Sequence, residues 1–340
     1  MDVGGGTQDI LVYDERLEIE NCPRLILPAP TQLVARRIER ATAAKRDIFL
    51  TGNLMGGGAC CRAVAEHVRA GLRVYAERQP ALTIHDNLNR VRERGVRVVG
   101  RRPRGAEPIE MRDVDRAALQ RAVAPFDITL PARCAVAVLD HGHSPTAGNR
   151  LFRFEQWRAF LQHGGHIRDL AHHKIPTHLT RMRAVRRDAP RALLMDTGAA
   201  AVWGALCDPV AARHRRKGLV MVNVGNQHTL AVLLRGSVVW GLFEHHTVRM
   251  TAAKLGSLID RLREGSLIND DVLDDWGHGC ATRPRRKGRG FDFVTVLGPK
   301  RAIADGLGYH SAAPHGDMML TGAFGLVAAY RATTGRSPRL

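Results

Sequence analysis

A short strand, a glycine-rich turn and a returning strand occur twice in this sequence, and this repeat constrains the fold more than any other feature. The first copy has Asp2, a turn over residues 4–7 and an apolar run up to Tyr13. The second copy has Asn223, a turn over residues 225–229 and an apolar strand after it. The spacing differs by one residue, since Thr7 follows Asp2 by five positions and Thr229 follows Asn223 by six.

The chemistry of such a turn follows from its glycines. Without a Cβ, successive backbone N–H groups can converge on an anion. Thr7 adds a hydroxyl, and Asp2 is placed where a carboxylate holds a metal-bound water beside a phosphate. A glycine-rich β-turn that binds nothing remains the alternative interpretation of either copy alone. Two such turns facing each other would clamp a nucleotide phosphate from both sides.

Several other strands end in polar or glycine-rich segments, as expected for an α/β protein. A strand over residues 47–52 leads through glycines 56–58 into a helix, and these glycines either bind an anion at the helix N-terminus or allow close packing. The apolar run 134–139 ends at Asp140 and His141. Because ligands of α/β sheets lie at the carboxyl ends of strands, both residues are expected at the rim of a site.

The length and the repeat predict two lobes. The chain has 340 residues, of which 44% are hydrophobic, which is enough for two cores. We predict a first lobe over 1–206, with an irregular insertion over about 72–131, and a second lobe over 207–340. An alanine-rich helix over 199–206 precedes the second glycine turn and is expected to pack closely between the lobes.

Composition narrows the expected partners and location. The net charge is +18, but only six of the 51 basic residues are lysine and the arginines are scattered, so we do not expect a nucleic-acid partner. Two basic runs, 213–217 and 283–289, could attract an acidic partner or a phosphorylated substrate. No apolar run is long enough to span a membrane and no signal peptide is visible, so we expect a cytoplasmic protein without membrane contact.

The order of these landmarks resembles the actin-like ATPase superfamily, which includes actin, heat-shock chaperone ATPases and sugar kinases. The first glycine turn resembles that family's first phosphate hairpin, residues 195–204 its connecting helix, and residues 223–229 its second phosphate hairpin. Residues 318–325 resemble its adenosine-side element. The resemblance implies a ribonuclease H-like α/β fold with duplicated lobes around an interlobe cleft that holds ATP with Mg²⁺.

A narrower resemblance covers nearly the whole chain. It points to domain-of-unknown-function family 1786, whose members are often labelled as pyruvate formate-lyase activating proteins. True activases of that kind are radical enzymes with a C-x-x-x-C-x-x-C motif, which does not occur among the six cysteines here. The segments that carry the resemblance are G-G-G-T-Q-D-I-L at 4–11, L-T-G-N-L-M-G-G-G at 50–58, D-H-G-H at 140–143, N-V-G-N-Q-H-T at 223–229, E-H-H-T at 244–247 and P-H-G-D-M-M-L-T-G at 314–322.

The superfamily resemblance implies roles for individual residues. Asp140 is the candidate catalytic residue, positioning the nucleophile for phosphoryl transfer. Mg²⁺ would depend on Asp2 and Asp140, because Asn223 stands where the family has an acid. The strand that leads into Asp2 in the family is not present, so we expect the first turn to be poorly anchored. The cofactor-binding candidates are Asp2, Gly4, Gly5, Gly6, Thr7, Gly225, Asn226, Gln227, His228, Thr229, Gly322 and Gly325.

Histidines and carboxylates occur together at four predicted turns or strand ends. Imidazoles and carboxylates are good ligands for zinc, iron or manganese, so a transition-metal site beside the nucleotide is one hypothesis. The alternative is that these histidines lie at the surface or make ordinary hydrogen bonds. The metal-ligand candidates are Asp2, Asp140, His141, His245, His246, His278, His315 and Asp317.

Three functions fit the sequence, and they leave open whether the protein is an enzyme. The first is an ATP-binding protein that hydrolyses ATP or transfers its γ-phosphate to an unidentified small molecule. The second is a nucleotide-gated activator of a partner protein, with weak turnover of its own. The third is a metal-dependent enzyme that keeps the fold but no longer uses ATP.

Overall fold

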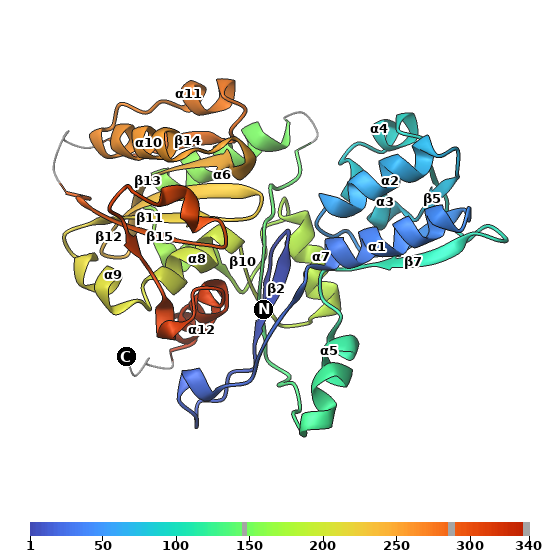
Figure 1. Cartoon of the computed structure of the whole chain (residues 1–340), viewed down its shortest axis with the longest axis horizontal. Coiled ribbons are helices and arrows are strands. Elements are labelled where there is room, and N and C mark those ends of the chain that lie inside the picture. The colour runs from blue at the N-terminus through green and yellow to red at the C-terminus, as the bar shows by residue number, and fades with distance from the viewer. Residues whose placement is uncertain (145–147, 285–289, 336–340) are drawn as a thin grey trace.

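The computed structural model describes residues 1–144, 148–284 and 290–335, which form a mixed α/β protein with three β-sheets. The α/β class predicted from the sequence is confirmed. Figure 1 shows the two larger sheets meeting near the N-terminus, with the helices around the smaller sheet set off to one side. Most of the basic run 283–289 lies outside the described residues.

The first large sheet contains both ends of the predicted first hairpin. Its strand order is β3-β2-β1-β8-β10-β9. Although β1 has only two residues, it pairs with β2 on one side and with β8 on the other, and the Met1 amino group donates to the Ala135 carbonyl at 2.9 Å. The strands are β1 (Asp2–Val3), β2 (Thr7–Leu11), β3 (Arg24–Pro28), β8 (Ala135–Val138), β9 (Ala171–His172) and β10 (Leu193–Met195).

The second large sheet contains the predicted second hairpin, which is confirmed as the antiparallel pair β11 and β12. Its order is β14-β13-β12-β11-β15-β16. Long runs of Val and Leu bury β11 and β12 on both faces, as expected of central strands. The strands are β11 (Leu219–Val224), β12 (His228–Arg235), β13 (Val238–His246), β14 (Gly279–Thr282), β15 (Phe293–Leu297) and β16 (His310–Ser311).

The two large sheets share one arrangement. In each, a central strand, β1 or β11, forms antiparallel pairs through the next two strands of the chain. On its other side, the same central strand pairs in parallel with β8 or β15, and a further parallel strand, β10 or β16, follows. In each half, the glycine turn follows the central strand. It therefore lies at the edge of the sheet where the central strand and its parallel neighbour both end.

The small sheet is entirely parallel, in the order β6-β5-β4-β7. The segment 72–131, expected to be irregular, supplies three of its four strands and pairs them with β4. The sheet is made of β4 (Ile48–Gly52), β5 (Val74–Ala76), β6 (Val96–Val98) and β7 (Glu107–Met111), with α1 (Pro30–Ala43), α2 (Ala59–Arg69), α3 (Arg78–Ile84) and α4 (Leu88–Glu93) around it.

The remaining helices surround the large sheets, with α10 and α11 beyond one face of the second sheet in Figure 1. No helix among the described residues is long and apolar enough to cross a membrane. These helices are α5 (Arg116–Val123), α6 (Asn149–Gln162), α7 (Thr180–Asp188), α8 (Thr197–Ala205), α9 (Pro209–His214), α10 (Ala252–Glu264), α11 (Asn269–Asp274) and α12 (Thr321–Thr333). Short 3₁₀ segments occur at Ile19–Asn21, Ala124–Phe126, Ile167–Leu170, Thr247–Arg249, Arg301–Ala304 and Pro314–Gly316.

Two helices, α8 and α12, cross in close contact at the base of the large sheets. α8 follows β10 and α12 follows β16, so they occupy matching places in the two halves. A Cβ at Gly204 would overlap the Thr321 carbonyl, and a Cβ at Gly325 would overlap the Ala200 carbonyl. The helix backbones therefore touch directly, and only glycine fits at these two positions. Residues 318–320, which precede α12, form a turn and not a strand.

We expect Gly325→Ala to lower the free energy of unfolding by about 1–3 kcal/mol or more, because the added methyl group forces the two backbones apart. The matched control is Gly256→Ala in α10, where a Cβ would meet only the Leu307 side chain at 3.5 Å. That substitution should instead stabilise the protein by about 0.5–1 kcal/mol, as alanine does in a helix interior. Urea unfolding of wild type and the two variants measures both changes in the free energy of unfolding. Equal stability of Gly325→Ala and wild type would contradict the close contact between the helices.

Candidate functional site

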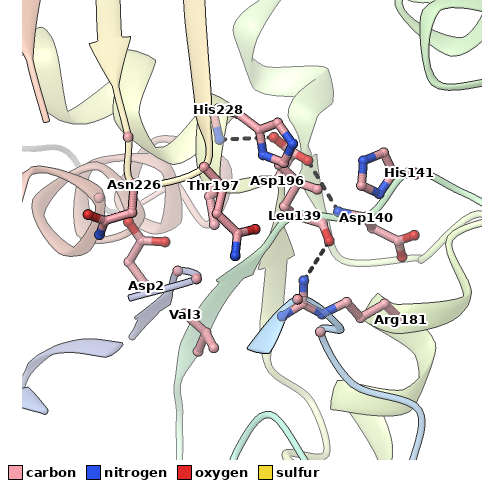
Figure 2. A pocket seen from close by; sticks show the side chains of 18 of the residues that line it. Asp2, Val3, Leu139, Asp140, His141, Arg181, Asp196, Thr197, Asn226 and His228 are labelled. Atoms are coloured by element: carbon pink, nitrogen blue, oxygen red, sulfur yellow. Dashed lines mark hydrogen bonds between the residues drawn. The ribbon is translucent and has the colours of Figure 1, made fainter. Parts of the chain in front are cut away.

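A cavity of about 360 Å³ lies where the strand ends of the three sheets meet. It is lined by both glycine turns, by glycines 56–58 and by the segments that follow β8, β10 and β15. In Figure 2, Asp2 and Asn226 lie together on one side of the view, His141 and Asp140 on the other, and His228 and Asp196 between them. The structure therefore gathers most of the predicted cofactor residues around one space.

The two glycine turns are closed in the same way. Gly4 N–H donates to the Thr7 carbonyl at 2.9 Å, and Gly225 N–H donates to the His228 carbonyl at 2.9 Å. The N–H groups at the turn tips donate no hydrogen bond to any other described residue. Paired turns with free N–H groups form an anion-binding concavity. The four tip residues are Gly5, Gly6, Asn226 and Gln227.

The tips of these turns touch each other. A Cβ built on Gly5 would lie 2.6 Å from Gln227 Cδ, and one built on Gly6 would lie 2.5 Å from Asn226 Nδ2. A Cβ on Gly58 would lie 2.9 Å from Gln227 Nε2, so this side chain reaches from the first turn to the glycines after β4. A side chain at Gly5 or Gly6 would therefore displace the Gln227 or Asn226 side chain of the second turn.

Two carboxylates line the cavity beside the first turn, and each has one oxygen without a hydrogen-bond partner among the described residues. These oxygens, Asp2 Oδ1 and Asp9 Oδ1, are buried. Burial, followed by the nearby Asp9 charge, raises the pKa of Asp2 to about 8, and burial raises the pKa of Asp9 to about 6. Unpaired buried carboxylate oxygens are ligands that a hard cation such as Mg²⁺ prefers, so these residues fit a magnesium ion. Asp9 was not among the sequence candidates.

The predicted catalytic residue Asp140 lines the cavity, but backbone groups occupy both of its oxygens. Oδ1 accepts from Gly142 N–H at 2.9 Å and Oδ2 from Met182 N–H at 2.9 Å, which ties the loop after β8 to α7. Burial, although opposed by these hydrogen bonds, raises its pKa. Each oxygen keeps a second lone pair. The role of Asp140 as a general base therefore stays a prediction.

Two arginines lie behind the acidic residues, and the sequence analysis found neither. Arg153, on α6, is buried and bonds both Asp196 and Glu244, with Nη1–Oδ2 at 2.9 Å and Nε–Oε2 at 2.7 Å. Arg181, on α7, donates two hydrogen bonds to the Asp113 carboxylate, both at 2.8 Å. It also donates to the Leu139 carbonyl at 2.7 Å, a bond that Figure 2 shows. These pairs bind the loops of the cavity to its surrounding helices.

Two of the predicted metal ligands, His141 and His278, lie next to His228, which was assigned to the second glycine turn. Their candidate ligand atoms all lie within 4.8 Å of one another. Burial lowers the pKa of His141 well below its usual value and that of His228 to about 3, so both rings are neutral at physiological pH. Neutral imidazole is the form that binds a metal.

The other predicted ligands are not brought to this cluster as a set. His245 is hydrogen-bonded to Asp275 at 3.0 Å, His315 lies 3.4 Å from Glu20, and Asp317 pairs with Arg24 at 3.1 Å. His246 lies beside the cluster, with its ring 4.8 Å from that of His278, but is outside the three-residue group.

Three cofactor candidates have other contacts. Thr229 is fully buried and its hydroxyl bonds Thr247 at 3.0 Å. Gly325 packs against α8 and does not line the cavity. Gly322 does line it, and the Asp2 carboxylate lies against its Cα, where any side chain would collide.

Comparison with protein families identifies the family of this chain. No curated protein matches the chain. A family model described as "Putative pyruvate format-lyase activating enzyme (DUF1786)" matches residues 55–303, well over half of the sequence. This range includes the second glycine turn and the histidine cluster, and it begins after the first glycine turn. The chain therefore belongs to domain-of-unknown-function family 1786, as its sequence motifs predicted.

Proposed function

We propose that this protein binds ATP with Mg²⁺ between its two glycine turns, as actin-like ATPases do, and hydrolyses it or transfers its γ-phosphate. One observation carries the proposal. Two sheets that share the order of five strands each present a glycine turn, closed by the same hydrogen bond, to a shared cavity. A duplicated ribonuclease H-like fold with two facing phosphate turns accounts for this symmetry.

The chemistry of the lining supports a phosphate ligand. The free N–H groups at the turn tips can each donate to a phosphate oxygen, and bonds of this kind to an anion are stronger than neutral ones. The cavity volume of about 360 Å³ falls within the range of small-molecule sites. Basic side chains are few at the tips, so the backbone would provide most of the contacts.

The acidic side of the cavity supports a cation beside the phosphates. Asp2 and Asp9 each have a buried oxygen without a partner, and a divalent ion would supply the missing positive charge. Mg²⁺ bound there would neutralise charge on the transferring phosphoryl group. In this proposal Asp140, across the cavity, orients the attacking water or hydroxyl group.

Calorimetric titration with Mg·ATP tests the proposal. We expect binding by the wild type, weaker binding of AMP, which lacks the outer phosphates, and at least about tenfold weaker binding of ATP by Gly225→Val, a change of about 1.4 kcal/mol. A Cβ at Gly225 would lie 2.9 Å from the His228 carbonyl oxygen, so valine would distort the turn that presents the N–H groups. The control is Gly100→Val, at an exposed glycine with no atom within 4 Å of its Cβ position.

The outcomes separate the candidate functions. Absence of ATP binding by the folded wild type at millimolar nucleotide would overturn the proposal. Equal binding by Gly225→Val and Gly100→Val would remove the second turn from the site. Tight binding with negligible turnover would favour the nucleotide-gated activator over the ATPase or phosphotransferase.

A further inference from the structure

We propose that His141, His228 and His278 bind one divalent transition-metal ion at the edge of the central cavity, with zinc as the expected occupant. The candidate ligand atoms of these side chains lie within 4.8 Å of one another. Tetrahedral zinc with nitrogen ligands at about 2.0–2.1 Å holds those nitrogens about 3.3 Å apart, so the rings must approach one another by up to about 1.5 Å to bind the ion. This site is separate from the magnesium position at Asp2 and does not depend on the proposed function.

The three histidines come from separate parts of the fold. His141 follows β8 of the first large sheet, His228 begins β12 of the second, and His278 immediately precedes β14. The His278 ring centroid lies 4.6 Å from that of His228 and 5.2 Å from that of His141. An ion held by all three would join the two large sheets at the cavity.

The rings lack the contacts that usually occupy a structural histidine. For His141 and His228, the described ranges of the chain contain no side-chain hydrogen-bond partner. His245, by contrast, is bonded to Asp275, and His163 lies 2.7 Å from the Ala159 carbonyl. Ring nitrogens that converge without partners are the arrangement expected of a metal site.

A buried carboxylate positions the third histidine. Glu244 Oε1 lies 3.0 Å from His278 Nδ1, and both side chains are almost completely buried, although these two atoms are not aligned for a hydrogen bond. Metal-binding histidines usually direct their second nitrogen to a carboxylate, which fixes the tautomer and leaves the other nitrogen free to bind the metal. Arg153 pairs with the other Glu244 oxygen at 2.7 Å and so keeps this carboxylate charged.

The ligand set selects the metal. Three imidazole ligands suit zinc and its neighbours, whereas Mg²⁺ and Ca²⁺ require oxygen ligands. Three protein ligands also leave the fourth tetrahedral position open, as in catalytic zinc sites. His141 and His228 both line the cavity, so the open position is available to a water molecule or to an oxygen of a bound substrate.

Metal analysis of the untagged full-length protein tests the inference. The protein is incubated with Zn²⁺ without nucleotide, free ion is removed, and bound zinc is measured by mass spectrometry. We expect one ion per chain in the wild type and in the control His163→Ala, whose histidine is exposed on α6's C-terminal side. His141→Ala and His278→Ala should lose the stoichiometric ion, and Co²⁺ should give the wild type a tetrahedral visible spectrum.

A second variant addresses the positioning carboxylate. Glu244→Gln should keep the three ligands and weaken zinc affinity by about 10–100-fold in a chelator competition, because the tautomer is no longer fixed. Wild-type protein that retains no zinc, or alanine variants that retain all of it, would overturn the inference. Both measurements omit nucleotide, so a failure of metal binding is distinguishable from a failure of ATP binding.

Discussion

Asp2→Asn should lower the rate of Mg·ATP turnover by about 10²–10³-fold, the usual cost of removing one preorganised charge from a reaction site. Asp2 has a buried oxygen without a hydrogen-bond partner and lies beside the first glycine turn. The amide keeps the shape of the side chain but cannot lose a proton to become the carboxylate that would hold the magnesium ion. Asp14→Asn, at an aspartate on the same hairpin whose carboxylate pairs with Arg16, is the control and should leave turnover unchanged.

The pH dependence of stability shows whether Asp2→Asn acts through charge or through unfolding. Burial, then the Asp9 charge, raises the pKa of Asp2 from 3.8 to about 8. Between these values the folded protein holds a proton that the unfolded chain releases, so stability falls as pH rises through this window, by up to about 1.4 kcal/mol per pH unit. The nucleotide-free variant lacks this slope and should be at least as stable as wild type at neutral pH.

Either of two results would count against this role for Asp2. Full turnover by a folded Asp2→Asn protein would show that Asp2 does not hold the ion. A melting temperature well below that of wild type at neutral pH would show that the aspartate serves the fold instead.

Arg153→Met should lower the free energy of unfolding by about 3–5 kcal/mol, the cost of breaking a buried ion pair on one side. Arg153 joins α6 to Asp196, which caps α8, and to Glu244 on β13. Burial opposes the Glu244 charge, but Arg153 and His278 hold its pKa well below the usual value. Methionine keeps the apolar stem and leaves both carboxylates without their shared cation.

A double substitution separates charge from packing. Arg153→Met with Glu244→Gln should recover part of the loss, because one buried charge no longer lacks a partner. Arg62→Met, at an exposed position on α2, should change stability by no more than about 0.5 kcal/mol. Denaturant unfolding of wild type, Arg153→Met, Glu244→Gln and the double variant gives the coupling energy, and additive losses would contradict the ion-pair network.

The features of the fold that could be predicted from the sequence are those with local causes. The second hairpin was predicted because a glycine turn separates two long apolar runs, and the helix expected over 199–206 is α8 (Thr197–Ala205). The parallel strands β5 and β6 were missed because each has only three residues and pairs with a strand distant in sequence. Nothing near such a strand indicates its partner.

The glycine turns of the candidate site could be predicted from the sequence, whereas its buried ion pairs and the choice among its histidines could not. The turn residues follow from backbone geometry, so the sequence identified them directly. Arg153 is one of many arginines, and its only local signal is its place between Phe152 and Phe154 on an otherwise aromatic segment. Neighbouring histidines and acids predicted too many metal ligands, because in a pair such as His245 and Asp275 the two side chains hydrogen-bond to each other.

The contact between the two glycine turns has a consequence for the rate of ligand exchange. The Gln227 side chain packs against Gly5 and Gly58, so it covers the tip of the first turn. If a phosphate group binds between the tips, this side chain has to move aside before the phosphate can enter or leave. The lifetime of such a complex would then depend on how often the Gln227 side chain moves away from Gly5.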